Sequence, residues 1–147
     1  MLSTEPSVAD CLSLLESGIA DWNQWRASHP DARCSLAGQT LSHGYFFEGN
    51  FSRMNLVGVN FQRACLIGAD FSGADLTDAD CSGAYLSDAT FCDANLSHTN
   101  FTGATLTRAD LRQAHLCETQ LADADIHAAQ LPSCPLSSFT KQKSIVF

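Results

Sequence analysis

The 147-residue chain has few basic residues. Eight Lys and Arg stand against sixteen Asp and Glu, which gives a formal net charge of −8. This balance disfavours direct binding to nucleic-acid phosphates, which proteins contact mainly through Lys and Arg. The sequence also has no run of 18 apolar residues, so we expect neither a membrane span nor a membrane partner. Its first residues lack a basic segment followed by an apolar stretch, which predicts no signal peptide and a cytoplasmic location.

Motifs of catalysis and metal binding are missing as well. The sequence contains no Gly-rich phosphate loop and no GxSxG nucleophile motif. His115 and Cys117 form the only close His/Cys pairing, which is too little for a metal site. We therefore expect a non-enzyme with no catalytic residue, no cofactor and no metal. The seven cysteines contain no CxxC pair, and their odd number without a secretory signal favours free thiols.

What the sequence does have is a strict repeat. Every fifth residue from Leu36 to Leu131 is apolar, without a slip in register. The residue two before each of these centres is nearly always small, and only Gln39 and Met54 are bulky there. A period of five is neither the 3.6 of a helix nor the 2 of a strand. Each unit is therefore predicted to be a short extended piece followed by a corner.

The residue before each centre is often Asp or Asn, and the residue after it is often Ser or Thr. The unit is thus A(D/N)(L/F)(S/T)x, as in GADFSGADLTDAD at 68–80. This pattern resembles the pentapeptide repeat family over about two-thirds of the chain. The resemblance implies an all-β fold, a right-handed quadrilateral parallel β-helix with four pentapeptides in each square coil. The twenty repeats would then form about five coils, spaced about 4.8 Å apart like paired strands.

A square coil points each centre, and the residue two before it, towards the inside. Residues twenty positions apart then lie on the same face, so two faces of the core carry aromatic residues and two carry aliphatic ones. Cys81 occupies one centre as a small hydrophobe. The expected structural core comprises Phe51, Phe61, Phe71, Phe91, Phe101, Leu56, Leu66, Leu76, Leu86, Leu96 and Leu106.

Residues 1–33 precede the repeats and are predicted to form one helix that caps the first coil. Ser3 or Ser7 is the expected start, and Pro30 is expected to end the helix. The segment WNQWR at 22–26 is similar to a leader found before the repeats in some bacterial, especially cyanobacterial, members of the family. A helix that binds a partner is the alternative to a cap. The expected cap residues, at helical spacing, are Leu12, Leu15, Ile19, Trp22 and Trp25.

Pro132 and Pro135 end the repeat, because proline cannot donate to a sheet ladder. The remaining tail keeps apolar residues at Phe139 and Ile145–Phe147. It either folds over the last coil or joins a homodimer through the C-terminal end. The expected organisation is one structural domain with a cap at 1–33, a β-helix at 34–135 and a tail at 136–147.

The stretch between Arg63 and Arg108 contains no Lys or Arg. Some members of the resembled family are DNA mimics that bind type II topoisomerases, so gyrase or topoisomerase IV is an alternative partner. When each aspartate is assigned its position within a coil of twenty residues, however, the aspartates fall on all four faces. Asp also suits the turns of the repeat, which accounts for its frequency. We therefore expect a non-enzymatic interaction module or scaffold with an unidentified protein partner. The candidate acidic interaction surface is Asp70, Asp75, Asp78, Asp80, Asp88 and Asp93.

Overall fold

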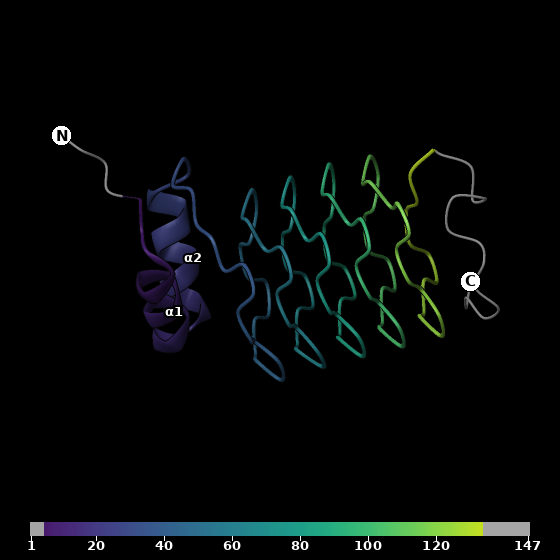
Figure 1. The fold of residues 1–147 in the computed structure, drawn as a ribbon, viewed down its shortest axis with the longest axis horizontal. Helices are drawn as coiled ribbons and strands as arrows, with labels where there is room; N and C mark the ends of the chain where they lie inside the picture. Colours follow the sequence, from purple (N-terminus) through teal and green to yellow (C-terminus); the bar gives the residue numbers. More distant parts are fainter. Residues whose placement is uncertain (1–4, 134–147) are drawn as a thin grey trace.

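The computed structural model describes residues 5–133, in which two helices lie at one end of a rod of stacked coils (Figure 1). The helices are α1 (Val8–Ser17) and α2 (Ile19–Ser28). Among the described residues no helix is long and apolar enough to cross a membrane. The predicted tail 136–147 lies outside the described residues, as do Cys134 and Pro135.

Parallel β-bridges hold the rod together, and each bridge joins residues twenty apart. They run without interruption from Ser35–Asn55 to Asp110–Gln130. At one bridge, Phe51 N–H donates to Asp70 C=O over 2.8 Å and Asp70 N–H donates to Gly49 C=O over 2.9 Å. Each pentapeptide contributes a single bridging residue, because a turn follows at once. The predicted four-sided coil of twenty residues therefore appears as isolated bridges rather than long strands.

The corners explain the polar positions of the repeat. In the turn after Phe71, Ala74 N–H donates to Phe71 C=O over 3.0 Å, and Gly73 has a φ of 66°. Asp78 takes the same place in the next turn with a φ of 58°. Glycine and aspartate are among the residues that tolerate this left-handed conformation best. The Asp before each centre also contributes, since Asp70 Oδ1 accepts from the Ser72 N–H over 2.8 Å.

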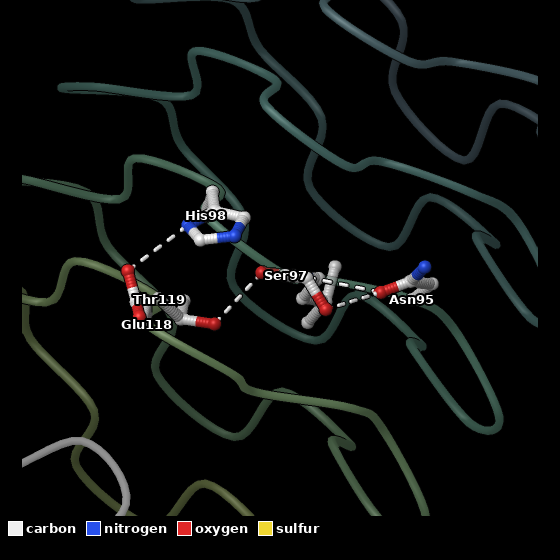
Figure 2. Close-up of polar contacts among 6 residues, drawn as sticks. Asn95, Ser97, His98, Glu118 and Thr119 are labelled. Atoms are coloured by element: carbon white, nitrogen blue, oxygen red, sulfur yellow. Dashed lines mark hydrogen bonds and ion pairs between the residues drawn. The ribbon is translucent and has the colours of Figure 1, made fainter.

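The core fills the interior of the rod from end to end. Phe71 is fully buried and stacks on Phe51 and Phe91, with ring centroids 5.3 and 5.1 Å away. Alanines two before the centres are buried beside these rings. Thr119 occupies an alanine position, and its buried hydroxyl donates to Leu96 C=O over 2.7 Å (Figure 2). The bore therefore accepts a polar atom where a backbone carbonyl of the preceding coil is within reach.

The helical segment differs from the single helix predicted. Ser7 caps α1 in a capping box with Asp10, and Gly18 ends α1 with a φ of 127° before α2 begins. Glycine allows this conformation and lets the chain turn into a second helix. The predicted start at Ser3 lies outside the described residues. The prediction of one helix was wrong because the apolar spacing continues across the break.

Candidate interaction surface

One side of the rod exposes aromatic residues where the repeat elsewhere places polar ones. Its bridging residues are, in order along the rod, Tyr45, Cys65, Tyr85, Thr105 and Asp125. The side chain of Tyr45 is 85% exposed and that of Tyr85 is 54% exposed. Coils are spaced about 4.8 Å apart, so the two tyrosines lie about 10 Å from each other with Cys65 between them.

The adjoining corner extends this apolar area. Phe47 follows Tyr45 by two residues and is 51% exposed. Glu48 N–H donates to Ile67 C=O over 2.9 Å. This bond places half-buried Ile67 next to Phe47, at the same corner of the following coil. We call these five residues the aromatic patch: Tyr45, Phe47, Cys65, Ile67 and Tyr85. Among the described residues, three of the four exposed large hydrophobic side chains belong to it.

The sequence contained a signal for this patch that the repeat obscured. Tyr45 and Tyr85 occupy the Asp/Asn position of their units, and Phe47 occupies the Ser/Thr position. Counting in steps of twenty along these outer positions, rather than along the core positions, would have placed Tyr45, Cys65 and Tyr85 in one row.

The candidate acidic residues do not converge on one surface. Asp70, Asp75 and Asp80 are bridging residues on three different sides, and each is half-buried. Each carboxylate accepts a hydrogen bond from the backbone N–H two residues later. At Asp75 the Oδ1 atom accepts from both the N–H and the hydroxyl of Thr77, over 3.0 and 2.6 Å. These three carboxylates therefore hold turns in place.

The other three acidic residues, Asp78, Asp88 and Asp93, lie exposed at three different corners. Asp88 forms a two-pronged ion pair with Arg108, in which Arg108 Nε donates to Oδ1 over 2.7 Å. These hydrogen bonds lower the pKa of Asp88. Of the six candidate residues, Asp78 and Asp93 therefore combine a corner position with no arginine partner in the described part of the chain.

The corner after Asn95 shows how local these polar contacts are. Figure 2 shows Asn95 accepting from Ser97, while His98 Nδ1 lies 3.3 Å from Glu118 Oε2 one coil later. Both His98 and Glu118 are largely exposed side chains. Within residues 5–133 no three His, Cys, Asp or Glu side chains come close enough to hold a metal ion.

Helix α2 lies against the first coil through polar side chains. Trp22 Nε1 donates to Asn50 C=O over 2.8 Å, and Asn23 Oδ1 accepts from Asn50 N–H over 2.8 Å. Arg26 Nη2 donates to Ser52 C=O over 2.6 Å. Of the expected cap residues, Leu15 and Trp22 are buried, and Leu12, Ile19 and Trp25 are partly buried against the core.

These contacts satisfy the backbone edge on one side of the first coil and leave another side open. Within the described residues, the N–H and C=O of Tyr45 have no hydrogen-bond partner. In later coils the equivalent groups of Cys65 bond to the preceding coil, at Gly44 C=O and Phe46 N–H. The open edge therefore coincides with the start of the aromatic patch.

Comparisons with known proteins give consistent matches over the repeats. The family model for pentapeptide repeats matches residues 33–73, 74–113 and 99–137, in eight copies. A search of curated proteins gave no match.

Three solved structures are among those that the chain resembles. Rfr23 from the cyanobacterium Cyanothece 51142 is 26% identical, with 66% of this chain and 63% of that chain covered and a TM-score of 0.48. A protein of the Arabidopsis thaliana thylakoid lumen is 34% identical, with 69% and 68% covered and a TM-score of 0.34. HetL from Nostoc sp. PCC 7120, involved in heterocyst differentiation regulation, is 26% identical, with 69% and 57% covered and a TM-score of 0.42. The chain thus spans less than two-thirds of the length of Rfr23 and of HetL.

Proposed function

This protein belongs to the pentapeptide repeat family, and on that premise we propose that it is a non-enzymatic interaction module that binds a protein through the aromatic patch. The proposed molecule is a cytoplasmic rod of about five coils at 34–135, between a cap at 1–33 and a tail at 136–147. The C-terminal end of the rod is covered either by the tail or by a second copy of the chain. Binding through the side of the rod requires neither a cofactor nor a metal.

The exposure of Tyr45 is the observation that carries the proposal. A tyrosine that is 85% exposed beside an exposed phenylalanine keeps a large apolar area in water. Tyrosine is enriched in the centres of protein interfaces, where its ring is buried and its hydroxyl finds a partner. The partner that fits is a protein segment with apolar side chains, since a chain of net charge −8 repels nucleic-acid phosphates.

The open backbone edge specifies the form of that segment. An extended strand can add to the free N–H and C=O of Tyr45 by main-chain hydrogen bonds. Its outward-facing side chains would then lie beside Tyr45 and Phe47, and the residues that follow the paired part would continue along the side of the rod to Tyr85. We therefore propose an extended apolar segment of a partner protein as the occupant.

The test compares two matched variants of the full chain. Tyr45→Ser, Phe47→Ser and Tyr85→Ser together remove the aromatic patch, and Asp78→Asn with Asp93→Asn is the control on other corners. A partner captured from host lysate is purified, and its Kd for each variant is measured by calorimetry. We expect the patch variant to bind about 1,000-fold more weakly, because the loss of two tyrosine anchors at about 2 kcal/mol each sums to about 4 kcal/mol. The control should bind like the wild type.

Equal binding of the wild type and the patch variant would contradict this proposal, provided that both unfold at the same denaturant concentration. All three substituted side chains are more than half exposed, so folding should tolerate their loss.

The acidic DNA mimic remains the second candidate, because the stretch between Arg63 and Arg108 contains no Lys or Arg. Its test is the inhibition of gyrase or topoisomerase IV by purified protein. Replacing Asp75, Asp78, Asp88 and Asp93 by Asn should abolish a mimic's inhibition and its salt dependence. Inhibition by the wild type and by the patch variant, but not by this quadruple variant, would replace our first proposal with the mimic.

A further inference from the structure

Two cysteine side chains meet where α1 lies against the first coil. Cys11 of α1 is fully buried, and Cys34, at the start of the β-helix, is 3% exposed. The Cys34 thiol and the backbone of Ser35 lie close enough to act on the Cys11 thiol. Burial, together with the neighbouring Cys34, raises the pKa of Cys11 to about 12. The two sulfurs are thus neighbours across the junction between cap and rod.

Arg26 of α2 holds the same junction. Its buried guanidinium donates through Nη1 to Ala32 C=O over 3.1 Å and faces Cys34 Sγ at 3.6 Å. Through Nη2 it donates to Ser52 C=O. The backbone next to Cys34 is therefore fixed from α2, while Cys11 approaches it from α1.

We propose that Cys11 and Cys34 are a modification site, at which a disulfide ties α1 to the first coil under oxidising conditions. The oxidant is a low-molecular-weight disulfide such as oxidised glutathione. One protein thiolate attacks it, which forms a mixed disulfide and releases one glutathione thiolate. The second protein thiolate then attacks the bound protein sulfur, forms the Cys11–Cys34 bond and releases the second glutathione. The two protons lost by the cysteines end on the two glutathione thiols.

Access to the sulfurs requires α1 to leave the first coil, because both side chains are buried. The disulfide therefore forms through an open cap and then keeps it closed. Under reducing conditions both cysteines stay free, as the sequence predicts. For two other cysteines of the rod, Cys81 and Cys92, the groups that act on the thiol include no cysteine.

The experiment uses the purified full chain, incubated with oxidised glutathione or with dithiothreitol and then alkylated. Trypsin cuts after Arg26, Arg33 and Arg53, so the disulfide joins peptide 1–26 to peptide 34–53, each with one cysteine. We expect mass spectrometry to find this linked pair in most of the oxidised protein. The Tm of the oxidised form should rise by about 5–10 °C, as for a bridge that closes a loop of this size.

Two variants separate this bridge from other oxidation. Cys34→Ala should lose both the linked peptides and the rise in Tm, whereas Cys65→Ala should keep both. The wild-type peptide map decides the pairing even where Cys34→Ala folds poorly. Glutathione on exposed Cys117 with Cys11 and Cys34 still reduced would overturn the proposal. So would a Cys11–Cys34 link that forms only when the chain is oxidised in guanidinium.

Discussion

At the scale of the residue, the aspartates and asparagines of the repeat accept hydrogen bonds within their own turn. Asp75 illustrates this, because its Oδ1 atom accepts from both the N–H and the hydroxyl of Thr77. A carboxylate that is hydrogen-bonded to its own turn is less accessible to a binding partner than a free one. The net charge of −8 therefore overstates the acidic surface of the rod.

Phe71 offers the sharpest test of the core. It is fully buried and stacks on two other phenylalanines, so its truncation removes contacts on both faces of the ring. We expect Phe71→Ala to lower the free energy of unfolding by about 3–5 kcal/mol. Phe47→Ala is the matched control, since Phe47 is 51% exposed and should cost less than about 1 kcal/mol. Urea unfolding of both variants measures the difference, and equal losses would contradict the burial of Phe71.

Asp110 gives a prediction for acid stability. Hydrogen bonds from the Arg112 side chain, followed by the Arg112 backbone N–H, lower the pKa of Asp110 to about 2. The unfolded chain, with an ordinary pKa of 3.8, binds this proton first as the pH falls. The stability from this carboxylate is therefore complete above about pH 4 and is lost as the pH approaches 2.

The comparison of wild type with Asp110→Asn checks this sign. The wild type should have the higher urea midpoint at pH 5, and the difference should shrink steadily between pH 4 and pH 2. Asp123→Asn, at an exposed corner, controls for the removal of one charge. A difference that stays constant over this range would show that Asp110 does not titrate in the manner stated.

At the scale of the element, the core was predictable and the docking of the helices was not. The period of five places Phe51, Phe71 and Phe91 in one stack, because the number of residues in a coil is the same throughout. The helices obey no such rule. Asn23 and Arg26 bind carbonyls and an N–H of the first coil, and those groups acquire a position only when the coil forms. The same limit applies to the contact between Cys11 and Cys34.

Deletion of residues 1–30 tests the role of the two helices. The change uncovers Phe51 and frees the C=O groups of Asn50 and Ser52, which α2 now binds. A free sheet edge beside an exposed aromatic ring favours pairing with another chain. We expect the shortened protein to associate end to end, as measured by light scattering after size-exclusion chromatography. A monomer with unchanged stability would show that the helices do not cap the rod.

At the scale of the whole molecule, the helices close one part of the rod's end and the aromatic patch begins at another. Helix α2 binds the backbone edge of the first coil at Asn50, whereas the edge at Tyr45 is open within the described residues. The molecule therefore has a direction along its axis as well as four distinct sides. A partner bound at Tyr45 would contact one end and one side together.

Because each coil has twenty residues, the side of the rod on which an outer residue lies depends on its position within the coil. Inserting one pentapeptide between Tyr45 and Tyr85 would keep every core position, yet it would rotate Tyr85 by a quarter turn onto the neighbouring side. Inserting four pentapeptides would return Tyr85 to its side, one coil farther along. Repeats can thus be gained or lost without harm to the core while a binding surface is split or restored. In a lineage of such rods, the core tolerates insertions and deletions of five residues. A patch formed by residues of several coils is retained only when twenty residues are inserted or deleted.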